Sequence, residues 1–288
     1  ICNTMKERNH PRPRLLAPAG GREQLVAAVR CGADAVYLGA AAFNARAGAE
    51  NFGGGALKEA VAYCHGRGVE VHVTLNTLIA DRETRPLLEQ LREIAQSGAD
   101  ALIVQDLGVA RLARDCCPSL PLHASTQLSI HNAAGARAMK ALGFGCVVLA
   151  RELTGAEISA IYREVGQEIA LETFVHGALC MSLSGQCYLS AMLGGRSGNR
   201  GRCAQPCRLD FRSPGGREYA LSLKDLSLVE RMEALAKTGV SYLKIEGRMK
   251  RPEYVYAATA ACRAALDGGE YDLETLRAVF SRSGFTDG

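Results

Sequence analysis

The chain has 288 residues, of which 34 are Lys or Arg and 30 are Asp or Glu; 48% are hydrophobic and 6% are aromatic. This composition is that of an ordinary globular protein, and it excludes an intrinsically disordered chain and a collagen-like fibre. The net charge of +4 is too small to indicate a partner for the molecule as a whole.

Short apolar runs rich in β-branched residues alternate with helical patterns along the chain, as in repeated βα units around a parallel sheet. The eight runs are Arg14–Ala17, Ala35–Leu38, Val69–Leu75, Ala101–Val104, Leu120–His123, Cys146–Leu149, Ile169–Phe174 and Tyr242–Ile245. The helical stretches between them include Gly21–Arg30, Ala56–Arg67, Thr84–Ser97, Leu107–Asp115, Asn132–Leu142 and Thr154–Val165. Eight such units predict a TIM-type (β/α)8-like barrel, although an open doubly wound sheet would show the same alternation.

The βα rhythm stops for more than 60 residues between the seventh run and the eighth. We therefore expect a lead-in over residues 1–13, a barrel-like catalytic domain over 14–177 and 221–266, and a cysteine-rich insertion over 178–220. Residues 267–288 are expected to begin a linker to a further C-terminal domain. The insertion would leave from the C-terminal end of strand seven, which is the end at which barrels build active sites. It is expected to contain a hairpin turn at 213–216, and a helix is expected near 226–237.

Four of the eleven cysteines gather in this insertion, at Cys180, Cys187, Cys203 and Cys207. Four thiolates on flexible loops can bind a tetrahedral zinc ion or an iron–sulfur cluster. The spacing alone does not decide between the two, and structural or unpaired thiols are a third interpretation. Residues 1–14 are polar and no run approaches the roughly 18 apolar residues of a membrane span, so we expect a cytoplasmic protein without a membrane partner.

Positive charge also gathers in the insertion. From Arg196 to Arg217 there are six arginines and one acid, which gives +5 in 22 residues. Arginine suits the forked recognition of phosphate or carboxylate groups, although a solvated loop would have the same composition.

Polar side chains follow the predicted strands and would meet at one mouth of a barrel. The candidate catalytic residues among them are Arg151, Glu152, Glu172, His176, Lys244 and Glu246. Strand alternation points Lys244 into the barrel, and Glu246 on the same face is the partner we expect for it. His72 and His123, inside apolar strands, are interpreted as core or lumen residues. His176 is expected to contact a substrate or to tune a bound cluster.

Several motifs together resemble those of a family of collagenase-like peptidases. It is the family numbered thirty-two among the peptidase families of unknown catalytic type. The motifs are "ETFVHGALC" and "SGQCYLS" in residues 172–190, "GRSGNRGRCAQPCR", "LAPAG", "STQLSIHN", "VLARELT" and "LKIEGRMKRPEYV". The likeness covers nearly the whole chain, with the motifs in the same order. The motif "GRSGNRGRCAQPCR" in the insertion resembles the RNA-modifying members of the family more than the two members that act together in anaerobic ubiquinone synthesis.

The resemblance implies a function beyond the peptidase name. Members of the family make 5-hydroxycytidine in 23S rRNA or 5-hydroxyuridine in tRNA without molecular oxygen. They hold a 4Fe-4S cluster on four cysteines, which match Cys180, Cys187, Cys203 and Cys207. Prephenate is the small-molecule hydroxyl source that the resemblance implies, and Arg196, Arg200, Arg202 and Arg208 would contact the RNA.

We therefore expect an enzyme that hydroxylates position 5 of a pyrimidine in rRNA or tRNA. Two alternatives stay open: a collagenase-like peptidase, and a catalytic or accessory role in anaerobic ubiquinone synthesis. The sequence shows neither a nucleophile–base pair nor a metalloprotease motif for the first of these.

Overall fold

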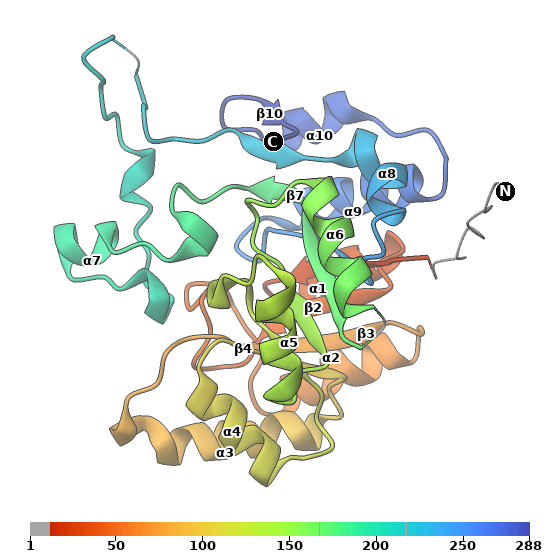
Figure 1. Ribbon diagram of the computed structural model, residues 1–288, viewed down its shortest axis with the longest axis vertical. Coiled ribbons are helices and arrows are strands. Elements are labelled where there is room, and N and C mark those ends of the chain that lie inside the picture. The colour runs from red at the N-terminus through yellow and green to blue at the C-terminus, as the bar shows by residue number, and fades with distance from the viewer. Residues whose placement is uncertain (1–11, 167, 217) are drawn as a thin grey trace, which may run out of the picture.

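The computed structural model describes residues 12–166, 168–216 and 218–288. Most of the lead-in expected over residues 1–13 therefore lies outside the described residues. The chain forms a central barrel of strands surrounded by helices, with one irregular insertion at an end of the barrel (Figure 1).

The barrel consists of eight parallel strands, each of which overlaps one of the runs expected from the sequence. They are β1 (Arg14–Ala19), β2 (Ala35–Gly39), β3 (Glu70–Leu75), β4 (Ala101–Val104), β5 (Leu122–Ala124), β6 (Cys146–Val148), β7 (Ala170–Ala178) and β9 (Tyr242–Ile245). Strands β1 to β7 pair in chain order, and β9 pairs with both β1 and β7. The sheet is thus closed, which confirms the TIM-type barrel and excludes the open doubly wound sheet.

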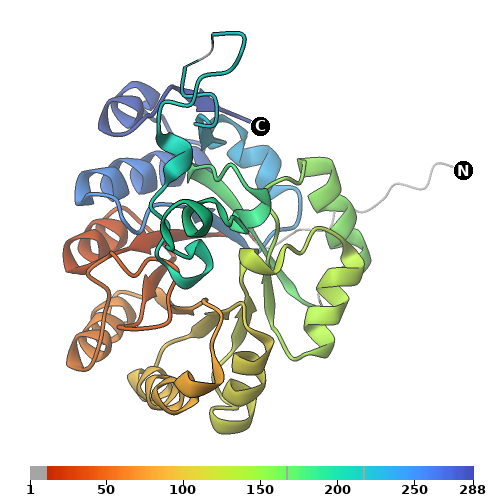
Figure 2. The ribbon, with the colours of Figure 1, turned by 90° about the vertical axis from the view of Figure 1, so that its left-hand side faces the viewer.

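Helices cover the outside of the barrel, as Figure 2 shows from one end. They are α1 (Arg22–Arg30), α2 (Gly55–His65), α3 (Thr84–Ser97), α4 (Leu107–Cys116), α5 (Ala133–Ala141), α6 (Gly155–Val165), α8 (Met232–Ala236), α9 (Pro252–Leu266) and α10 (Leu273–Val279). The outward side chains of the strands, such as Val71 and Val73 of β3, pack with the helices in one large apolar cluster. Several helices begin at a side-chain cap, because an acceptor there satisfies N–H groups of the first turn. In α4, for example, Asp106 accepts hydrogen bonds from the N–H groups of Gly108 and Val109.

Several inward side chains of the strands are polar. Successive strand residues point to opposite faces, so Glu70, His72 and Thr74 of β3 face the lumen while their neighbours face the helices. Glu172 of β7 and Lys244 of β9 also lie in the interior, and both are buried. An interior of this kind needs specific polar partners, because a buried charge or hydrogen-bonding group without one is costly.

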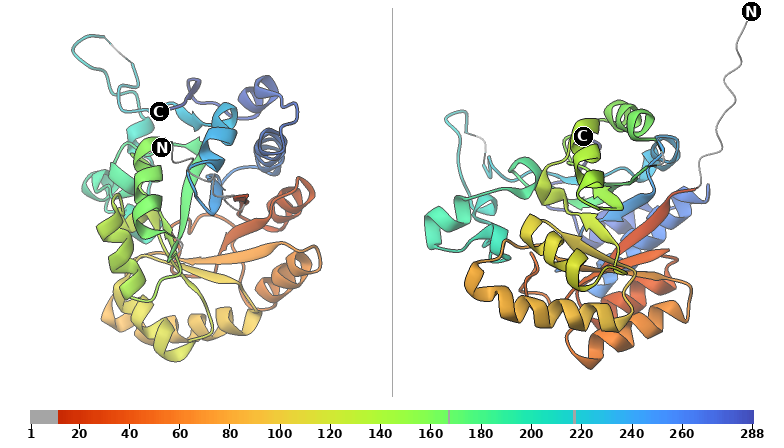
Figure 3. Two further views of the ribbon diagram at one scale, coloured as in Figure 1. Left: turned by 45° about the vertical axis from the view of Figure 1, so that its right-hand side comes forward. Right: turned by 60° about the horizontal axis from the view of Figure 1, so that its bottom comes forward.

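The insertion follows β7 and lies over the end of the barrel at which the strands finish, in front of the strands in Figure 2. It contains the short helix α7 (Leu189–Gly194) and several single-turn 3-10 helices. The expected hairpin at 213–216 is a turn, in which Gly216 N–H donates to Ser213 O, without flanking strands among the described residues. Figure 3 shows the insertion and the start of β1 at opposite ends of the barrel.

The helix expected near 226–237 is shorter than the sequence suggests. Its first residues form strand β8 (Asp225–Ser227), which pairs antiparallel with the end of β7, and α8 begins only at Met232. Residues 267–288, expected to begin a linker, contain α10 and strand β10 (Phe285–Thr286), which pairs with β8. None of the helices in the described ranges is both long and apolar enough to cross a membrane.

Candidate active site

Three arginines surround one glutamate at the mouth of the barrel. Arg46 follows β2, Arg151 follows β6, and Glu246 and Arg248 follow β9. The Glu246 carboxylate accepts a hydrogen bond from Arg46 Nη2 at 2.9 Å and lies 3.5 Å from Arg151 Nη2. We call Arg46, Arg151, Arg248 and Glu246 the arginine cluster. Its three positive charges and one negative charge leave a net charge of +2 at the mouth.

The ionisation of the cluster follows from this arrangement. Burial by itself would raise the pKa of Glu246, but Arg46 and Arg151 outweigh burial and hold that pKa at about 2. Burial and the nearby charge of Arg46 lower the pKa of Arg248 to about 10, which leaves it protonated at neutral pH. The cluster therefore stays charged through the physiological range, and the sequence prediction that Glu246 and Arg151 share a site agrees with their contact.

Two guanidinium nitrogens of the cluster are buried without a hydrogen-bond partner, Arg151 Nε and Arg248 Nη1. Arg248 is 3% exposed, and its other contact is a hydrogen bond from Nη2 to Asn44 Oδ1 at 3.2 Å. A Cβ on Gly39 would lie 2.3 Å from Arg248 Nη1, so the end of β2 must be glycine for this side chain to fit. Buried charged donors without partners are costly, and a bound anion would satisfy them.

Lys244 is placed inside the barrel as expected, but its expected partner is wrong. Lys244 Nζ donates to Glu172 Oε1 at 2.6 Å, and both side chains are almost fully buried. Strands β7 and β9 are hydrogen-bonded neighbours, and Phe174 of β7 is in register with Lys244, which brings Glu172 within reach. Glu246 is two residues nearer the mouth and is held instead by Arg46 and Arg151. Lys244 also lies over the Tyr37 ring, 4.3 Å from its centroid.

His176 and Glu152 lie outside the arginine cluster. The register of β7 shifts between Phe174 and His176, and the His176 ring stacks on Tyr254 at 5.8 Å and meets the edge of Phe285 at 5.4 Å. Burial lowers the pKa of His176 to about 4, so the ring is neutral. Glu152 accepts hydrogen bonds from the N–H and hydroxyl of Ser184 at 2.8 and 3.1 Å. Glu152 thus holds the first turn of the insertion.

The four cysteines of the insertion carry free thiols. Burial raises the pKa of Cys207, Arg208 opposes this effect, and the other three cysteines raise the pKa further, which places all four thiols in one electrostatic neighbourhood. No three of the four sulfur atoms lie within 4.8 Å of one another. Tetrahedral zinc would hold thiolate sulfurs about 3.8 Å apart, given Zn–S bonds of about 2.3 Å. Backbone N–H groups donate to Cys187 Sγ and Cys203 Sγ, both at 3.3 Å.

The cysteines lie beside the arginine cluster because the insertion is seated on the loop after β2. The Glu246 carboxylate is the main cause of the raised pKa of the Arg46 guanidinium group, and the Cys203 thiol adds to it. Gly201 has a φ of +76°, and a Cβ at this position would lie 2.4 Å from Asn44 O. This close approach requires glycine and fixes the insertion next to the residues that carry Arg46.

Two of the four arginines expected to bind RNA are committed to protein contacts. Arg200 donates to Leu78 O at 2.7 Å and forms a forked ion pair with Glu83. Arg208 donates to Leu179 O at 2.7 Å and to Leu223 O at 2.9 Å. Arg196 and Arg202 are exposed, and Arg196 Nε donates to the Arg202 carbonyl at 3.1 Å. Arg200 and Arg208 therefore hold the insertion in place, whereas Arg196 and Arg202 face solvent.

Sequence reasoning did not single out Arg46 as a site residue. It lies in a loop of small residues, "AAAFNARAGAE", that matches no motif. Its one signal is a lone arginine shortly after the C-terminal end of a predicted strand, which in a barrel faces the mouth.

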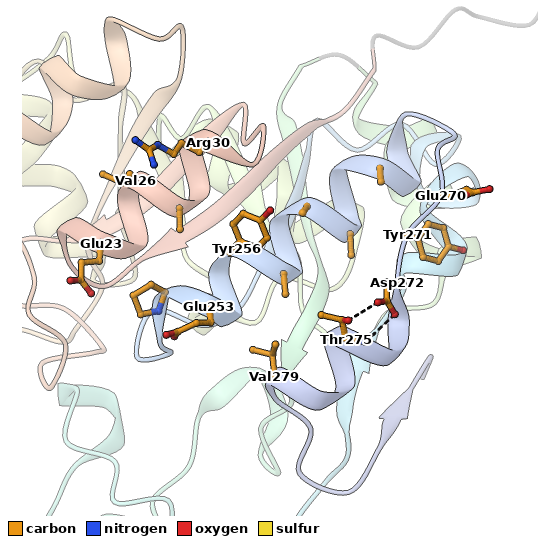
Figure 4. A pocket seen from close by; sticks show the side chains of 16 residues that line it. Glu23, Val26, Arg30, Glu253, Tyr256, Glu270, Tyr271, Asp272, Thr275 and Val279 are labelled. Carbon is orange, nitrogen blue, oxygen red and sulfur yellow. Dashed lines mark hydrogen bonds between the residues drawn. The ribbon is translucent and has the colours of Figure 1, made fainter.

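A groove of about 740 Å³ lies elsewhere, on the outer layer between α1, α9 and α10 (Figure 4). Its lining is largely apolar and includes Val26, Tyr256 and Val279. It contains neither the cysteines nor the arginine cluster, so it is separate from the candidate active site.

Comparison with known proteins agrees with the motifs. The model of the family described as "Peptidase family U32" matches residues 20–287. Similar proteins include a 23S rRNA 5-hydroxycytidine synthase of Escherichia coli, 41% identical over 89% of this chain and 39% of the relative. A tRNA hydroxylation protein P1 of Bacillus subtilis is 35% identical over 89% of this chain and 63% of its own. A collagenase of Porphyromonas gingivalis is 35% identical over 95% of this chain and 72% of its own. The chain thus spans less than two thirds of the first two relatives.

A solved structure of a U32 peptidase has the same fold, with a TM-score of 0.55 and 15% sequence identity, over 84% of this chain and 96% of that one. A structure from Coccidioides immitis named "putative fructose-1,6-biphosphate aldolase" reaches a TM-score of 0.50 at 13% identity over 94% of this chain and 92% of that one. At these identities the likeness concerns the fold alone.

Proposed function

The chain belongs to peptidase family U32, and from this premise we propose that it is the part of an RNA-modifying enzyme that hydroxylates position 5 of cytidine or uridine in rRNA or tRNA. The reaction uses an iron–sulfur cluster and an anionic oxygen donor in place of molecular oxygen. Relatives named for hydroxylation of 23S rRNA and of tRNA support the substrate class. One observation carries the proposal: a segment with four free thiols lies beside a partly buried arginine cluster at the mouth of the barrel.

The donor set fits a 4Fe-4S cluster held by Cys180, Cys187, Cys203 and Cys207. Four cysteines on one irregular segment are the usual ligand set of such a cluster. Backbone N–H donors to two of the sulfurs are contacts of the kind that tune the potential of such clusters. Held by these four thiolates, a cluster would supply electron transfer. Arg208 lies close enough to Cys180 and Cys207 to offset their negative charge.

The arginine cluster binds the oxygen donor. Arg248 Nη1 and Arg151 Nε are its unpartnered donors, and the net charge of +2 matches a ligand with two carboxylates, as prephenate has. Glu246 orients Arg46 and Arg151 by accepting from both. Because Gly201, two residues before Cys203, packs against the backbone of Asn44, two residues before Arg46, a donor held by the arginines lies next to the cluster-binding segment.

Arg196 and Arg202, exposed on the same segment, contact RNA phosphates. Phosphate neutralisation supplies much of the affinity of such interfaces, and the target pyrimidine must leave its stack to reach the mouth of the barrel. Arg200 and Arg208 act indirectly, because they hold the segment that presents the other two.

A peptidase would need a different arrangement. Among the residues that the structure describes, no histidine ring is hydrogen-bonded to a serine, threonine or cysteine side chain; His65 pairs with Asp100, and His131 contacts a backbone carbonyl. No side-chain contact among the described residues therefore favours proteolysis as a second function.

The test is complementation in a host that lacks the corresponding gene, with mass spectrometry of nucleosides from purified rRNA and tRNA. The intact gene should restore a 5-hydroxylated pyrimidine, and the fraction that carries it identifies the RNA. Cys180→Ser should not restore it, whereas Cys116→Ser should, because Cys116 is exposed at the end of α4 and outside the insertion. Unchanged RNA with the intact gene would refute the proposal.

A further inference from the structure

A second group of potential metal ligands lies inside the barrel, distinct from the cysteines. His72, His123 and Glu172 come from β3, β5 and β7. Alternate strands of a barrel contribute the residues of one interior layer, so these three side chains face one another. Each is nearly or fully buried, with exposed fractions of 1%, 7% and 0%. Among the described residues, one potential ligand atom from each of the three lies within 4.8 Å of those from the other two.

Each of the three side chains has a buried polar atom without a partner. These atoms are His72 Nδ1, His123 Nδ1 and Glu172 Oε2. A buried polar atom normally has a hydrogen-bond partner, and one without a partner calls for an ion, a water or strain. Three such atoms on three facing side chains share one simple explanation, which is a cation between them.

The remaining atoms of the group are held in place by other side chains. His72 Nε2 lies 3.5 Å from Glu70 Oε2, and Glu172 Oε1 accepts from Lys244 Nζ at 2.6 Å. A carboxylate on the far nitrogen of a ligating histidine, and a donor on the far oxygen of a ligating carboxylate, are the contacts that orient ligands in metal sites. They leave the unpartnered atoms of His72 and Glu172 free to bind.

We propose that His72, His123 and Glu172 bind one divalent first-row transition-metal ion in the lumen of the barrel. Two imidazoles and one carboxylate are the ligands of many zinc and iron(II) sites. A tetrahedral ion with metal–ligand distances of about 2.0–2.2 Å holds its ligand atoms about 3.3 Å apart. The three ligand atoms lie within 4.8 Å of one another, so small side-chain rotations bring them to that separation. The proposal is independent of the proposed function and of the cysteines.

Cadmium-113 NMR of the 288-residue chain can separate the two sites, because thiolate ligation moves the cadmium resonance far downfield of nitrogen and oxygen ligation. With enough Cd²⁺ to fill the thiolates as well, we expect one nitrogen- and oxygen-ligated resonance that integrates to about one ion per chain. His72→Ala and His123→Ala should abolish it. Cys203→Ser and the control His65→Ala, which alters a half-exposed surface histidine, should leave it intact. Absence of the resonance from the wild type, or its survival in both lumen variants, would overturn the proposal.

A variant that keeps all three proposed ligands tests the site even if the lumen histidine variants do not fold. Glu70 is partly exposed and contacts His72 without belonging to the proposed ligands. Glu70→Gln should weaken Zn²⁺ binding about 10- to 100-fold, as loss of an orienting contact does elsewhere. The readout is competition with a chromophoric chelator, on the Cys203→Ser background to remove thiolate binding. An unchanged Zn²⁺ affinity in protein with a native circular dichroism spectrum would contradict the proposed site.

Discussion

Lys244→Met should destabilise the chain strongly, because it leaves a charge without a partner inside the barrel. Glu172 is fully buried and Lys244 is its partner at 2.6 Å. Removing one member of a buried ion pair costs about 3–5 kcal/mol, since the remaining charge stays out of water. At about 2–4 °C per kcal/mol for a chain of this size, the melting temperature should fall by roughly 6–20 °C.

The assay is differential scanning calorimetry of Lys244→Met, Glu246→Gln and the double variant Lys244→Met/Glu172→Met, all without added metal. Replacing both members of a buried pair by apolar side chains is often neutral or stabilising, so the double variant should recover most of the loss. Glu246→Gln leaves the Lys244–Glu172 pair intact. It therefore tests whether Glu172, the observed partner, or Glu246, the partner expected from strand alternation, stabilises Lys244. A fall of less than about 3 °C for Lys244→Met, or a double variant as unstable as the single one, would refute the reasoning.

Three further predictions concern the mouth of the barrel. Cys180→Ser should lower the iron and acid-labile sulfide of anaerobically purified protein from about four each per chain to a small fraction, whereas Cys116→Ser should not; one zinc and no sulfide in the wild type would replace the cluster with a structural zinc site. Arg248→Met should weaken binding of a dicarboxylate about 10- to 100-fold in calorimetric titration, because it removes a charge-assisted hydrogen bond, and equal binding by both proteins would exclude this residue from the anion site. The hydrogen bond and charge of Arg200 hold the pKa of Glu83 at about 2, below its usual 4.5. The carboxylate therefore stabilises the folded chain above about pH 4.5, and this stabilisation is lost as the pH falls towards 2. Glu83→Gln should therefore show a smaller drop in melting temperature between pH 6 and pH 3 than the wild type, and equal drops would contradict the assignment.

The strands and most helices could be predicted because their signals are local. In β3, alternation separates Val71 and Val73 from His72 within a single element, and helix ends are marked by glycines such as Gly98, which has a φ of +82°. The prediction failed where pairing with a distant strand overrode the local sequence pattern. Leu226, read as the start of a helix, instead lies in β8, which extends the sheet beside β7.

The partner of Lys244 shows why the site could be predicted only in part. Alternation gives the face to which a side chain points but not the neighbour it meets, because the neighbour depends on the register between β7 and β9. Glu246 shares the face of Lys244, yet Glu172, 72 positions away in the sequence, makes the contact. Arg46 was missed for the same reason, since it approaches Glu246 from 200 positions away.

The order of the strands has a consequence for how the chain is made. Strand β9, only four residues long, pairs with both β1 and β7 and is the last strand of the barrel to be synthesised. Until Tyr242–Ile245 has left the ribosome, the edges of β1 and β7 that β9 covers are unpaired, apart from the end of β7 that pairs with β8, and Glu172 lacks its partner Lys244. Exposed edges of this kind invite aggregation. A premature stop between residues 208 and 241 should therefore yield insoluble protein, even though seven of the eight barrel strands and all four cysteines of the insertion are already present.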